Sequence, residues 1–232
     1  MIDKNRMLEV AQMYDLDISH CIDSLCLYAK ILVEYNQKVN LTAITDPEGI
    51  VQKHFLDSLL FANCEHVTGK YVDVGTGAGF PGVVAKLFKP ELKVTLMEPT
   101  GKRVDFLKYL CSELGLEDIE FAKERAEEAA RKAWREQFDT AGARAVAAMN
   151  VLAEYCLPLV KVGGVFVAMK ADAESEIMQS EDAIKKLGGE IAEIKTFTLP
   201  NESKRSLVIV KKISQTSSVY PRNGGKIAKA PL

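Results

Sequence analysis

Residues 72–82 read Val72-Asp73-Val74-Gly75-Thr76-Gly77-Ala78-Gly79-Phe80-Pro81-Gly82, and this stretch predicts a strand, a glycine-rich turn and the start of a helix. The apolar residues before the turn suit a buried strand, and the proline suits the first turn of a helix, where its missing N–H is not needed. Gly75, Gly77 and Gly79 allow backbone angles and a close ligand approach that a Cβ would forbid. We therefore expect the free N–H groups of this turn to hold a nucleotide-like ligand.

Two acids near the turn indicate which ligand it holds. The spacing G-x-G-x-G departs from the G-x-G-x-x-G of dinucleotide sites, because Phe80 follows the third glycine. The carboxylate of Asp73 would repel a pyrophosphate but suits a ligand with an ammonium group and a cationic sulfur, which describes S-adenosyl-L-methionine (SAM). Glu98 ends a second predicted strand, where a carboxylate can accept hydrogen bonds from ribose hydroxyls. The alternative is a glycine turn of some other doubly wound protein.

The composition fits one globular domain with a modest extension. The chain has 232 residues, of which 47% are hydrophobic and 27% charged. Its net charge of −2 means that any nucleic-acid surface must be local. The charged first residues lack an apolar signal core, and no apolar run reaches membrane-spanning length. We therefore expect a cytoplasmic protein without membrane contact.

The cysteines and histidines give no pattern of a metal site. The cysteines contain no C-x-x-C pair, and the three histidines do not join them at zinc spacing. Free thiols in a reducing compartment are usually buried, so we expect inert cysteines and no metal. The residues concerned are Cys21, Cys26, Cys64, Cys111, Cys156, His20, His54 and His66.

The apolar periodicity divides the chain into three parts. Residues 1–66 read as a helical cap, residues 67–213 as the ligand-binding core, and residues 214–232 as a basic tail. The tail is either a flexible extension or an arm that contacts phosphates. Predicted core strands cover residues 71–74, 93–97, 119–122, 143–148, 165–169, 191–199 and 206–213. Predicted core helices cover residues 81–88, 102–115, 125–136, 150–159 and 172–187.

Alternating strands and helices predict an α/β fold. The expected architecture is a doubly wound, mostly parallel seven-stranded sheet, closed by a hairpin and preceded by the helical cap. The ligand of such a sheet binds outside the carboxyl ends of its strands, near the first strand.

Several short motifs occur together, in one order, along nearly the whole chain. They are Asn40-Leu41-Thr42, His54-Phe55-Leu56-Asp57-Ser58-Leu59, Asp73 to Gly82, Gly101-Lys102-Arg103, Arg125-Ala126-Glu127, Ala143-Arg144-Ala145, Met169-Lys170 and Tyr220-Pro221-Arg222. With them the chain resembles the small-subunit ribosomal RNA methyltransferase G family, also called glucose-inhibited division protein B. The ordered set is far more specific than any single motif.

The resemblance implies a class I SAM-dependent methyltransferase with a Rossmann-like core. The implied reaction is methylation of guanine N7 in a loop of 16S rRNA near the decoding site, at the guanine usually numbered 527. The implied partners are 16S rRNA and the small ribosomal subunit or its assembly intermediate, and the implied state is a monomer.

The resemblance also implies roles for individual residues. Gly75 and Phe80 should line the SAM pocket, and Ala126 and Glu127 should lie beside the adenine. Arg144 should be a SAM-site or catalytic residue. Basic residues match family positions around the cleft or in its motifs, and among them we expect Lys170 in the catalytic site and the others on RNA. These basic residues are Lys102, Arg103, Arg125, Lys170, Arg205 and Arg222.

Structural roles compete with these assignments. Glu127 could be one acid on a solvated helix over residues 125–136, and Arg205 could only solubilise a turn. A buried arginine without a function is uncommon, which favours a functional Arg144 between its two alanines. His54 reads as structural, with Asp57 or a backbone carbonyl as its partner.

Two local misfits also bear on the assignments. Lys102 and Arg103 open a helix, where the dipole disfavours cations, and this mildly favours a function for them. Gly142 departs from the β-branched residue that a strand prefers, so the extent of the fourth strand is in doubt.

The implied chemistry needs alignment more than proton transfer. Guanine N7 carries an in-plane lone pair and no proton, so the methyl transfer needs no general base. We therefore expect Arg144 and Lys170 to orient the base through guanine O6. Residues 147–152 lack the Asn/Asp-Pro-Pro-aromatic motif of exocyclic-amine enzymes, and Cys156 lies mid-helix, where a cytosine C5 nucleophile is not expected.

Two other functions remain open from the sequence. A small-molecule SAM methyltransferase would have a closed apolar pocket and would tolerate truncation after Ile213. A non-catalytic regulator that binds SAM or another nucleotide would be distinguished by titration with SAM and with NAD.

Overall fold

The computed structural model describes residues 2–171 and 173–232. The strands are β1 (Lys70–Val74), β2 (Lys93–Met97), β3 (Ile119–Ala122), β4 (Phe138–Arg144), β5 (Val160–Lys170), β6 (Gly189–Thr198) and β7 (Lys204–Lys212). The helices are α1 (Lys4–Gln12), α2 (Ile22–Asn36), α3 (Pro47–Gly49), the π-helix η1 (Ile50–Leu56), α4 (Asp57–Ala62), α5 (Gly82–Phe88), α6 (Gly101–Glu113), α7 (Ala126–Ala129), α8 (Met149–Cys156), the 3₁₀-helix η2 (Leu157–Leu159), α9 (Glu174–Lys186) and α10 (Gly224–Lys229).

The strands form one seven-stranded sheet in the order β3-β2-β1-β4-β5-β7-β6. Strands β1 to β5 are parallel, and β7 runs antiparallel between β5 and β6. The strand order reverses at β1, which has β2 on one side and β4 on the other. The doubly wound, mostly parallel sheet predicted from the sequence is therefore confirmed, including the closing hairpin.

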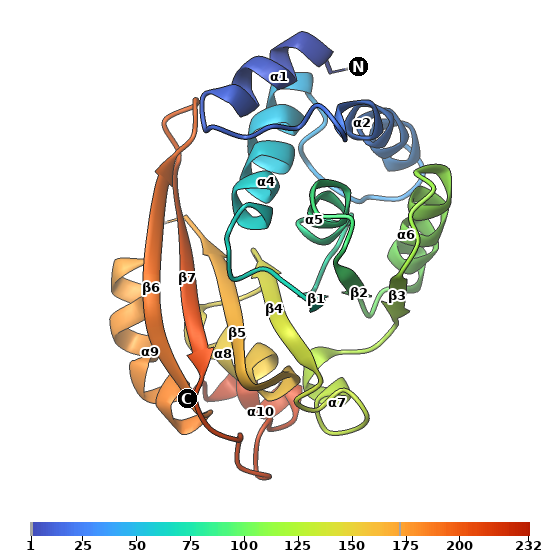
Figure 1. Ribbon diagram of the computed structural model, residues 1–232. Coiled ribbons are helices and arrows are strands. Elements are labelled where there is room, and N and C mark those ends of the chain that lie inside the picture. The colour runs from blue at the N-terminus through green and yellow to red at the C-terminus, as the bar shows by residue number, and fades with distance from the viewer. Residues whose placement is uncertain (1, 172) are drawn as a thin grey trace.

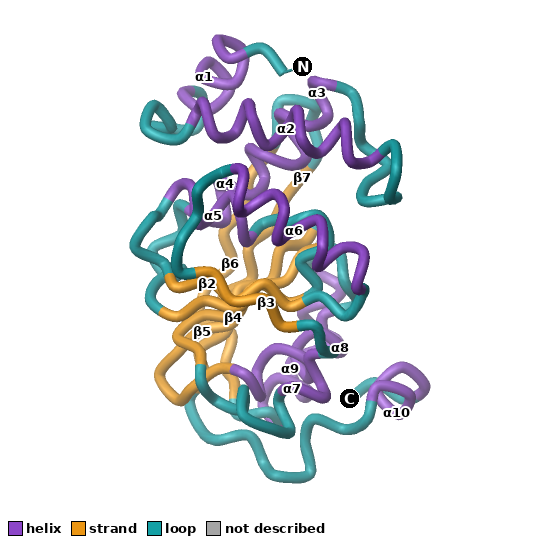
Figure 2. The backbone as a smooth tube through the Cα atoms, turned by 90° about the vertical axis from the view of Figure 1, so that its right-hand side faces the viewer, coloured by secondary structure: helices purple, strands orange, loops and turns teal. Residues whose placement is uncertain are grey.

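Two hydrophobic clusters cover the two faces of the sheet. Helices α4, α5 and α6 lie on one face, and α7, α8 and α9 on the other (Figure 1). The cap helices α1 and α2 lie above α4 and α5 (Figure 2) and bury their apolar stripes in the same cluster as α5 and α6. Because cap and core share this cluster, α2 reaches the glycine turn: the hydroxyl of Tyr28 donates to the carbonyl of Ala78 at 2.5 Å.

The fourth strand corrects one sequence-based expectation. We expected it at residues 143–148, but β4 covers Phe138–Arg144 and pairs Gly142 with Asp73 of β1. A Cβ on Gly142 would lie 2.7 Å from Phe61 Cζ and 2.8 Å from the Tyr71 hydroxyl. The glycine therefore permits close packing against α4 and does not interrupt the strand.

The prediction of a charged helix over residues 125–136 is also wrong. Helix α7 ends at Ala129, and turns follow to Glu136, which has a positive φ of 50°. The charged side chains of these turns are used in contacts. Arg131 donates to the carbonyl of Pro221 at 2.8 Å, and Arg135 donates to the carbonyl of Tyr220 at 2.8 Å. Tertiary contacts with the C-terminal segment thus replace a solvated helix.

The C-terminal segment, residues 214–232, packs on the core. Thr216 and Ile227 are buried, and Tyr220 contacts the cluster beneath α8. The fully buried ammonium of Lys212 donates to the carbonyl of Leu157 at 2.6 Å and to the Thr216 hydroxyl at 2.5 Å. The reading of this segment as a flexible tail is therefore wrong.

Two further sequence-based expectations can be compared with the described residues. All five cysteines are free, and four of them are buried, as expected for inert thiols. Within the described part of the chain, no helix combines the length and apolar character needed to cross a bilayer.

Candidate functional site

A cavity of about 390 Å³ opens at the carboxyl ends of β1, β2, β3 and β4. Its wall is built from the last residues of β1 and β2, the loops that follow the four strands, and residues of α6, α7 and α8. This volume falls in the range of small-molecule sites, and the strand-order reversal at β1 is where doubly wound sheets bind ligands. Six of the predicted site residues line it: Gly75, Glu98, Arg103, Arg125, Ala126 and Glu127.

Gly75 is the residue of the glycine turn that lines this cavity. Glu98, only 2% exposed, accepts hydrogen bonds from the N–H of Gly77 at 3.2 Å and of Thr100 at 2.9 Å. Gly75 has a φ of +69°, and an added Cβ would lie 2.8 Å from Val146 Cγ2. The turn therefore needs glycine both for its backbone angle and for the close approach of the loop after β4.

Other predicted cofactor residues support the turn without lining the cavity. Asp73 is fully buried, and its Oδ2 accepts a hydrogen bond from the N–H of Gly82 at 2.8 Å, at the start of α5. Gly79 leaves room for Tyr28, whose hydroxyl would lie 2.7 Å from an added Cβ. Phe80 stacks between the rings of Tyr28 and His54, with centroids 5.0 Å and 4.4 Å away.

Arg144 ends β4 and joins the core to the cap. Its Nη1 donates to the carbonyl of Lys53 at 3.0 Å and to Asp57 Oδ2 at 3.3 Å. Its Nη2 lies 3.3 Å from His54 Nδ1, and its guanidinium carbon lies 5.0 Å from the centre of the Phe80 ring. A guanidinium has five N–H donors, so two have no protein partner within residues 2–171 and 173–232.

The partner of His54 differs from both sequence-based candidates. Arginine is always a donor, so His54 Nδ1 accepts from Arg144 and Nε2 carries the proton, which it donates to Thr42 Oγ1 at 2.9 Å. Burial and the charge of Arg144 lower the pKa of His54 to about 3. His54 is therefore neutral, and its ring binds Thr42 and Arg144 instead of either predicted partner.

Lys170 and Arg205 are also held by acidic partners. Lys170 Nζ donates to the carbonyl of Ala147 at 2.7 Å and pairs with Glu176 at 2.6 Å, so it fixes the loop that covers Gly75. Arg205 Nε lies 3.3 Å from Asp57 Oδ1, the carboxylate that Arg144 also contacts. Burial raises the pKa of Asp57, against the effect of these two guanidinium groups.

The remaining predicted RNA contacts fall into two groups. Lys102 and Arg125 are exposed and have no ion pair in the described parts of the chain. Arg103 lies 3.7 Å from Glu98 in the cavity wall, and Arg222 makes a 2.6 Å ion pair with the buried Glu154. Among these four residues, Lys102 and Arg125 are therefore the two whose positive charge has no carboxylate partner in the described parts of the chain.

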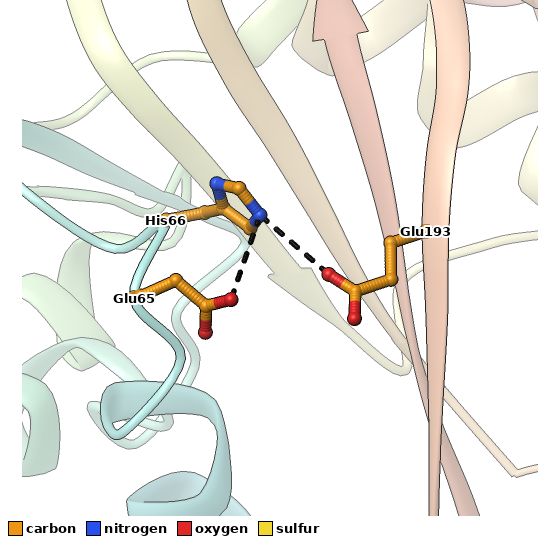
Figure 3. Close-up of side chains that lie close together, drawn as sticks. All are labelled: Glu65, His66 and Glu193. Carbon is orange, nitrogen blue, oxygen red and sulfur yellow. Dashed lines mark ion pairs between the residues drawn. The ribbon is translucent and has the colours of Figure 1, made fainter.

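A second cluster of titratable side chains lies on the β6 side of the molecule. The imidazole of His66 approaches Glu65 at 3.9 Å and Glu193 at 3.6 Å (Figure 3). The ammonium of Lys195 pairs with the same two carboxylates, at 2.5 Å and 3.8 Å. The ammonium of Lys195 already supplies a positive charge to both acids. We therefore interpret these residues as an ion-pair cluster that joins β6 to the loop before β1.

Comparison with known proteins identifies the family of this fold and cavity. The model of the family described as rRNA small subunit methyltransferase G matches residues 21–208. The chain belongs to this family. Its members include the ribosomal RNA small subunit methyltransferase G of Alkaliphilus metalliredigens, which is 49% identical over 216 residues, covering 91% of this chain and 90% of that one.

A second relative matches nearly the whole chain, and a solved structure matches the fold. The ribosomal RNA small subunit methyltransferase G of Alkaliphilus oremlandii is 44% identical over 235 residues, covering 99% of this chain and 98% of that one. A solved SAM-dependent O-methyltransferase from Thermotoga maritima shares the fold with a TM-score of 0.52 at 15% identity, over 80% of this chain and 72% of that one. The fold is that of class I SAM-dependent methyltransferases, and SAM is the cofactor of the family.

The residues of the cavity fit this cofactor. Glu98 and Glu127 place two buried carboxylates in its wall, where they can accept hydrogen bonds from hydroxyl and amino groups of a nucleoside. Beneath the turn, Asp73 Oδ1 and the Thr76 hydroxyl are buried without a hydrogen-bond partner among the described residues. The sequence did not predict Val146 or Tyr155 in the wall, because only folding brings the loop after β4 and α8 to the turn.

The buried carboxyl group of Asp73 should make the stability of this protein depend on pH. Burial raises its pKa from 3.8 to about 6, so the folded state binds more protons than the unfolded state between these values. Stability contributed by this group therefore falls as pH rises through that window. We expect Asp73→Asn to raise the melting temperature relative to wild type at pH 8 and to leave it unchanged at pH 4, as measured by circular dichroism.

The quantity to compare is the difference in melting temperature between wild type and Asp73→Asn. His54 is present in both proteins, and because its pKa is lowered, its contribution to stability rises with pH and would mask the effect of Asp73 in either protein alone. Equal melting temperatures of wild type and variant at pH 8 would contradict the charged, buried state of Asp73.

Proposed function

We propose that the protein transfers the methyl group of SAM to N7 of a guanine in a loop of 16S rRNA, at the position usually numbered 527. The observation that carries this proposal is the cavity at the carboxyl ends of β1 to β4, bounded by Glu98 and Glu127 and adjoined by Arg144 at the end of β4. Membership of the rRNA small subunit methyltransferase G family supports a ribosomal RNA substrate.

The proposed reaction needs no proton acceptor in the site. When bound, SAM supplies an electrophilic methyl group: N7 donates its lone pair to the methyl carbon, and the electrons of the breaking C–S bond go to sulfur. Guanine then carries the positive charge. His54, which accepts a hydrogen bond from Arg144, is neutral but buried and hydrogen-bonded through both ring nitrogens. The residues therefore act by aligning the two reactants.

Arg144 is the residue we assign to orient the base. Three of its hydrogen bonds hold the guanidinium against the cap, and its two remaining N–H donors can bind an acceptor such as guanine O6. The stacked Phe80 ring and the carboxylate of Asp57 fix the plane of the guanidinium. Asp57 also compensates a positive charge that would otherwise oppose the cationic product.

Lys170 acts in this proposal through the backbone. Its hydrogen bond to Ala147 and its ion pair with Glu176 hold the loop that begins at Ala145, a residue with a positive φ of 53°. A non-glycine residue in this conformation is strained and persists when its surroundings hold it. We therefore assign Lys170 to positioning the loop, and not to contact with the reacting atoms.

The exposed Lys102 and Arg125 are the proposed phosphate contacts. Each neutralised phosphate releases counterions, so each contact adds about one unit to the slope of log affinity against log salt. We expect Lys102→Ala and Arg125→Ala each to lower this slope by about one unit, measured by fluorescence anisotropy with an RNA hairpin that contains the target loop.

The matched control removes the same charge at the amino ends of the strands, on the side of the sheet opposite to the cavity. Lys93 is an exposed lysine at the first residue of β2, so it lies at the amino ends of the strands. Lys93→Ala should leave the salt slope unchanged. If it lowers the slope as much as Lys102→Ala, the RNA surface is not at the carboxyl edge.

Methylation of small ribosomal subunits tests the proposed function directly. Subunits from cells that lack the gene are incubated with the protein and SAM, and fragments of the 16S rRNA are examined by mass spectrometry. We expect one new 7-methylguanosine, at the proposed loop position. A methyl group on a different atom or nucleotide would overturn the N7 assignment, and transfer only to small molecules would overturn the RNA substrate.

The proposed function also implies a cellular compartment and an oligomeric state. A substrate in the small ribosomal subunit requires a cytoplasmic protein, and we propose that a monomer acts on the subunit or its assembly intermediate. Truncation after Ile213 no longer separates an RNA enzyme from a small-molecule enzyme. It would remove Arg222 from the buried Glu154, so loss of activity would report unfolding as well as loss of RNA contact.

A further inference from the structure

The C-terminal segment reaches the cavity through a short stretch, residues 216–224, which we call the strap. Two arginines that follow α7 hold its backbone. Arg135 donates to the carbonyls of Thr216 at 2.5 Å and Tyr220 at 2.8 Å, and Arg131 donates to the carbonyl of Pro221 at 2.8 Å. The strap is therefore attached to the same segment of chain that carries Glu127.

A buried ion pair fastens the far end of the strap to α8. The guanidinium of Arg222 donates from Nε to Glu154 Oε1 at 2.9 Å and from Nη2 to Glu154 Oε2 at 2.6 Å. The backbone N–H of Arg222 donates to the same carboxylate at 2.7 Å. Glu154 is fully buried, so two-pronged pairing to a rigid group sets the position of the next residues. Helix α10, which begins at the last residue of the strap, packs against α8 (Figure 1).

The strap places Gly224 against the cavity wall. A Cβ built on Gly224 would overlap Oε1 of Glu127 and would lie 3.3 Å from its carboxyl carbon. Glu127 is 5% exposed and lines the cavity. There is consequently no room for a side chain at position 224 unless the carboxylate of Glu127, which belongs to the cavity wall, moves.

We propose that Gly224 is a positioning residue for the cofactor, and that the strap completes the cavity by seating the carboxylate of Glu127. This inference rests on the proposed use of the cavity for SAM. The ligand class is a nucleoside whose amino or hydroxyl groups donate to Glu127. The residues of the strap do not touch the reacting atoms in this proposal, since they act through Glu127.

The neighbouring glycine provides a matched control. Gly224 and Gly225 are the first two residues of α10, and neither has a positive φ, so alanine suits the backbone of both. A Cβ on Gly225 would meet only Asn223 Oδ1, at 3.7 Å. The variants Gly224→Ala and Gly225→Ala therefore make the same chemical change in the same helix, and only the first displaces Glu127.

Isothermal titration of the two variants with SAM and with S-adenosylhomocysteine tests the proposal. We expect Gly224→Ala to raise both dissociation constants about 10-fold, the effect of losing roughly one good hydrogen bond, and Gly225→Ala to change them less than about twofold. The KM for SAM should rise by the same factor in Gly224→Ala, while the KM for the RNA substrate does not. The two variants should melt at the same temperature.

A double variant separates positioning from general damage. In a Glu127→Ala background no carboxylate remains to be displaced, so adding Gly224→Ala should cause no further loss of SAM affinity. A further loss in that background, or equal dissociation constants for Gly224→Ala and Gly225→Ala, would overturn the role of Gly224. A wild-type protein that fails to bind SAM would instead overturn the use of the cavity for this cofactor.

Discussion

Arg144→Ala is expected to lower kcat for methylation of small ribosomal subunits by about 100-fold or more, the usual effect of removing one positioned donor from an active site. The reason is that three hydrogen bonds fix the guanidinium of Arg144 and leave two N–H donors for an acceptor on the substrate. Arg144→Lys should recover little of this loss, because an ammonium lacks the planar fork. Single-turnover transfer of tritiated methyl groups measures the effect.

Arg205→Ala is the control for an indirect effect. It removes the other guanidinium from Asp57, at 3.3 Å, without touching Arg144. If Arg144 acts on the substrate, kcat should fall far less in Arg205→Ala than in Arg144→Ala. Equal losses in the two variants would show that the activity depends on the charge balance around Asp57 and would contradict the assignment of Arg144.

Glu154→Gln is expected to lower the free energy of unfolding by about 3 kcal/mol, because removing one partner of a buried ion pair leaves the other charge uncompensated. For a chain of this size that corresponds to a melting temperature lower by roughly 6–12 °C. Glu154 is fully buried and binds both the guanidinium and the backbone N–H of Arg222. Urea unfolding followed by circular dichroism measures the change.

The same substitution at an exposed ion pair provides the comparison. Glu181 pairs with Lys185 at 3.6 Å on the solvent face of α9, and both side chains are at least half exposed. Glu181→Gln should change the free energy of unfolding by less than about 0.5 kcal/mol. A similar effect of both variants would mean that the Arg222–Glu154 pair contributes no more than a surface contact.

Local patterns were sufficient to predict most of the core. Strands β2 and β3 begin and end at the predicted residues, because each is a short apolar run between polar turns. The glycine turn also has the predicted geometry, with a positive φ at Gly75, Gly77 and Gly79. These features depend on residues close together in the sequence, so a pattern can reveal them.

The errors arise where distant residues decide the structure. Gly142 reads as a strand breaker until Phe61 and Tyr71 are seen to occupy the space of a side chain. The alternative for Glu127, a solvated acid, fails because its side chain is buried next to Gly224 of the strap. Neither contact leaves a local signal, since each joins segments about 70 to 100 residues apart in the printed sequence.

The site was predicted from the sequence in outline only. The glycine turn and the acid at the end of the second strand led to Gly75 and Glu98 of the cavity wall, and the family motifs led to Ala126, Glu127 and the cluster around Arg144. Asp73 and Phe80 lie beneath or beside the turn, a distinction that burial decides and that a motif does not encode. Contact of these residues with the cofactor or with RNA stays a prediction for the experiments above.

The seating of Glu127 by Gly224 has a consequence for the order of events during translation. The cavity-lining residues lie between positions 74 and 155, so they are synthesised before the strap. A nascent chain that has already formed β1 to β4 therefore lacks a seated Glu127 until residue 224 has emerged. In this proposal, newly made protein would thus acquire full affinity for its methyl donor only once the strap is free to pack on the assembled sheet.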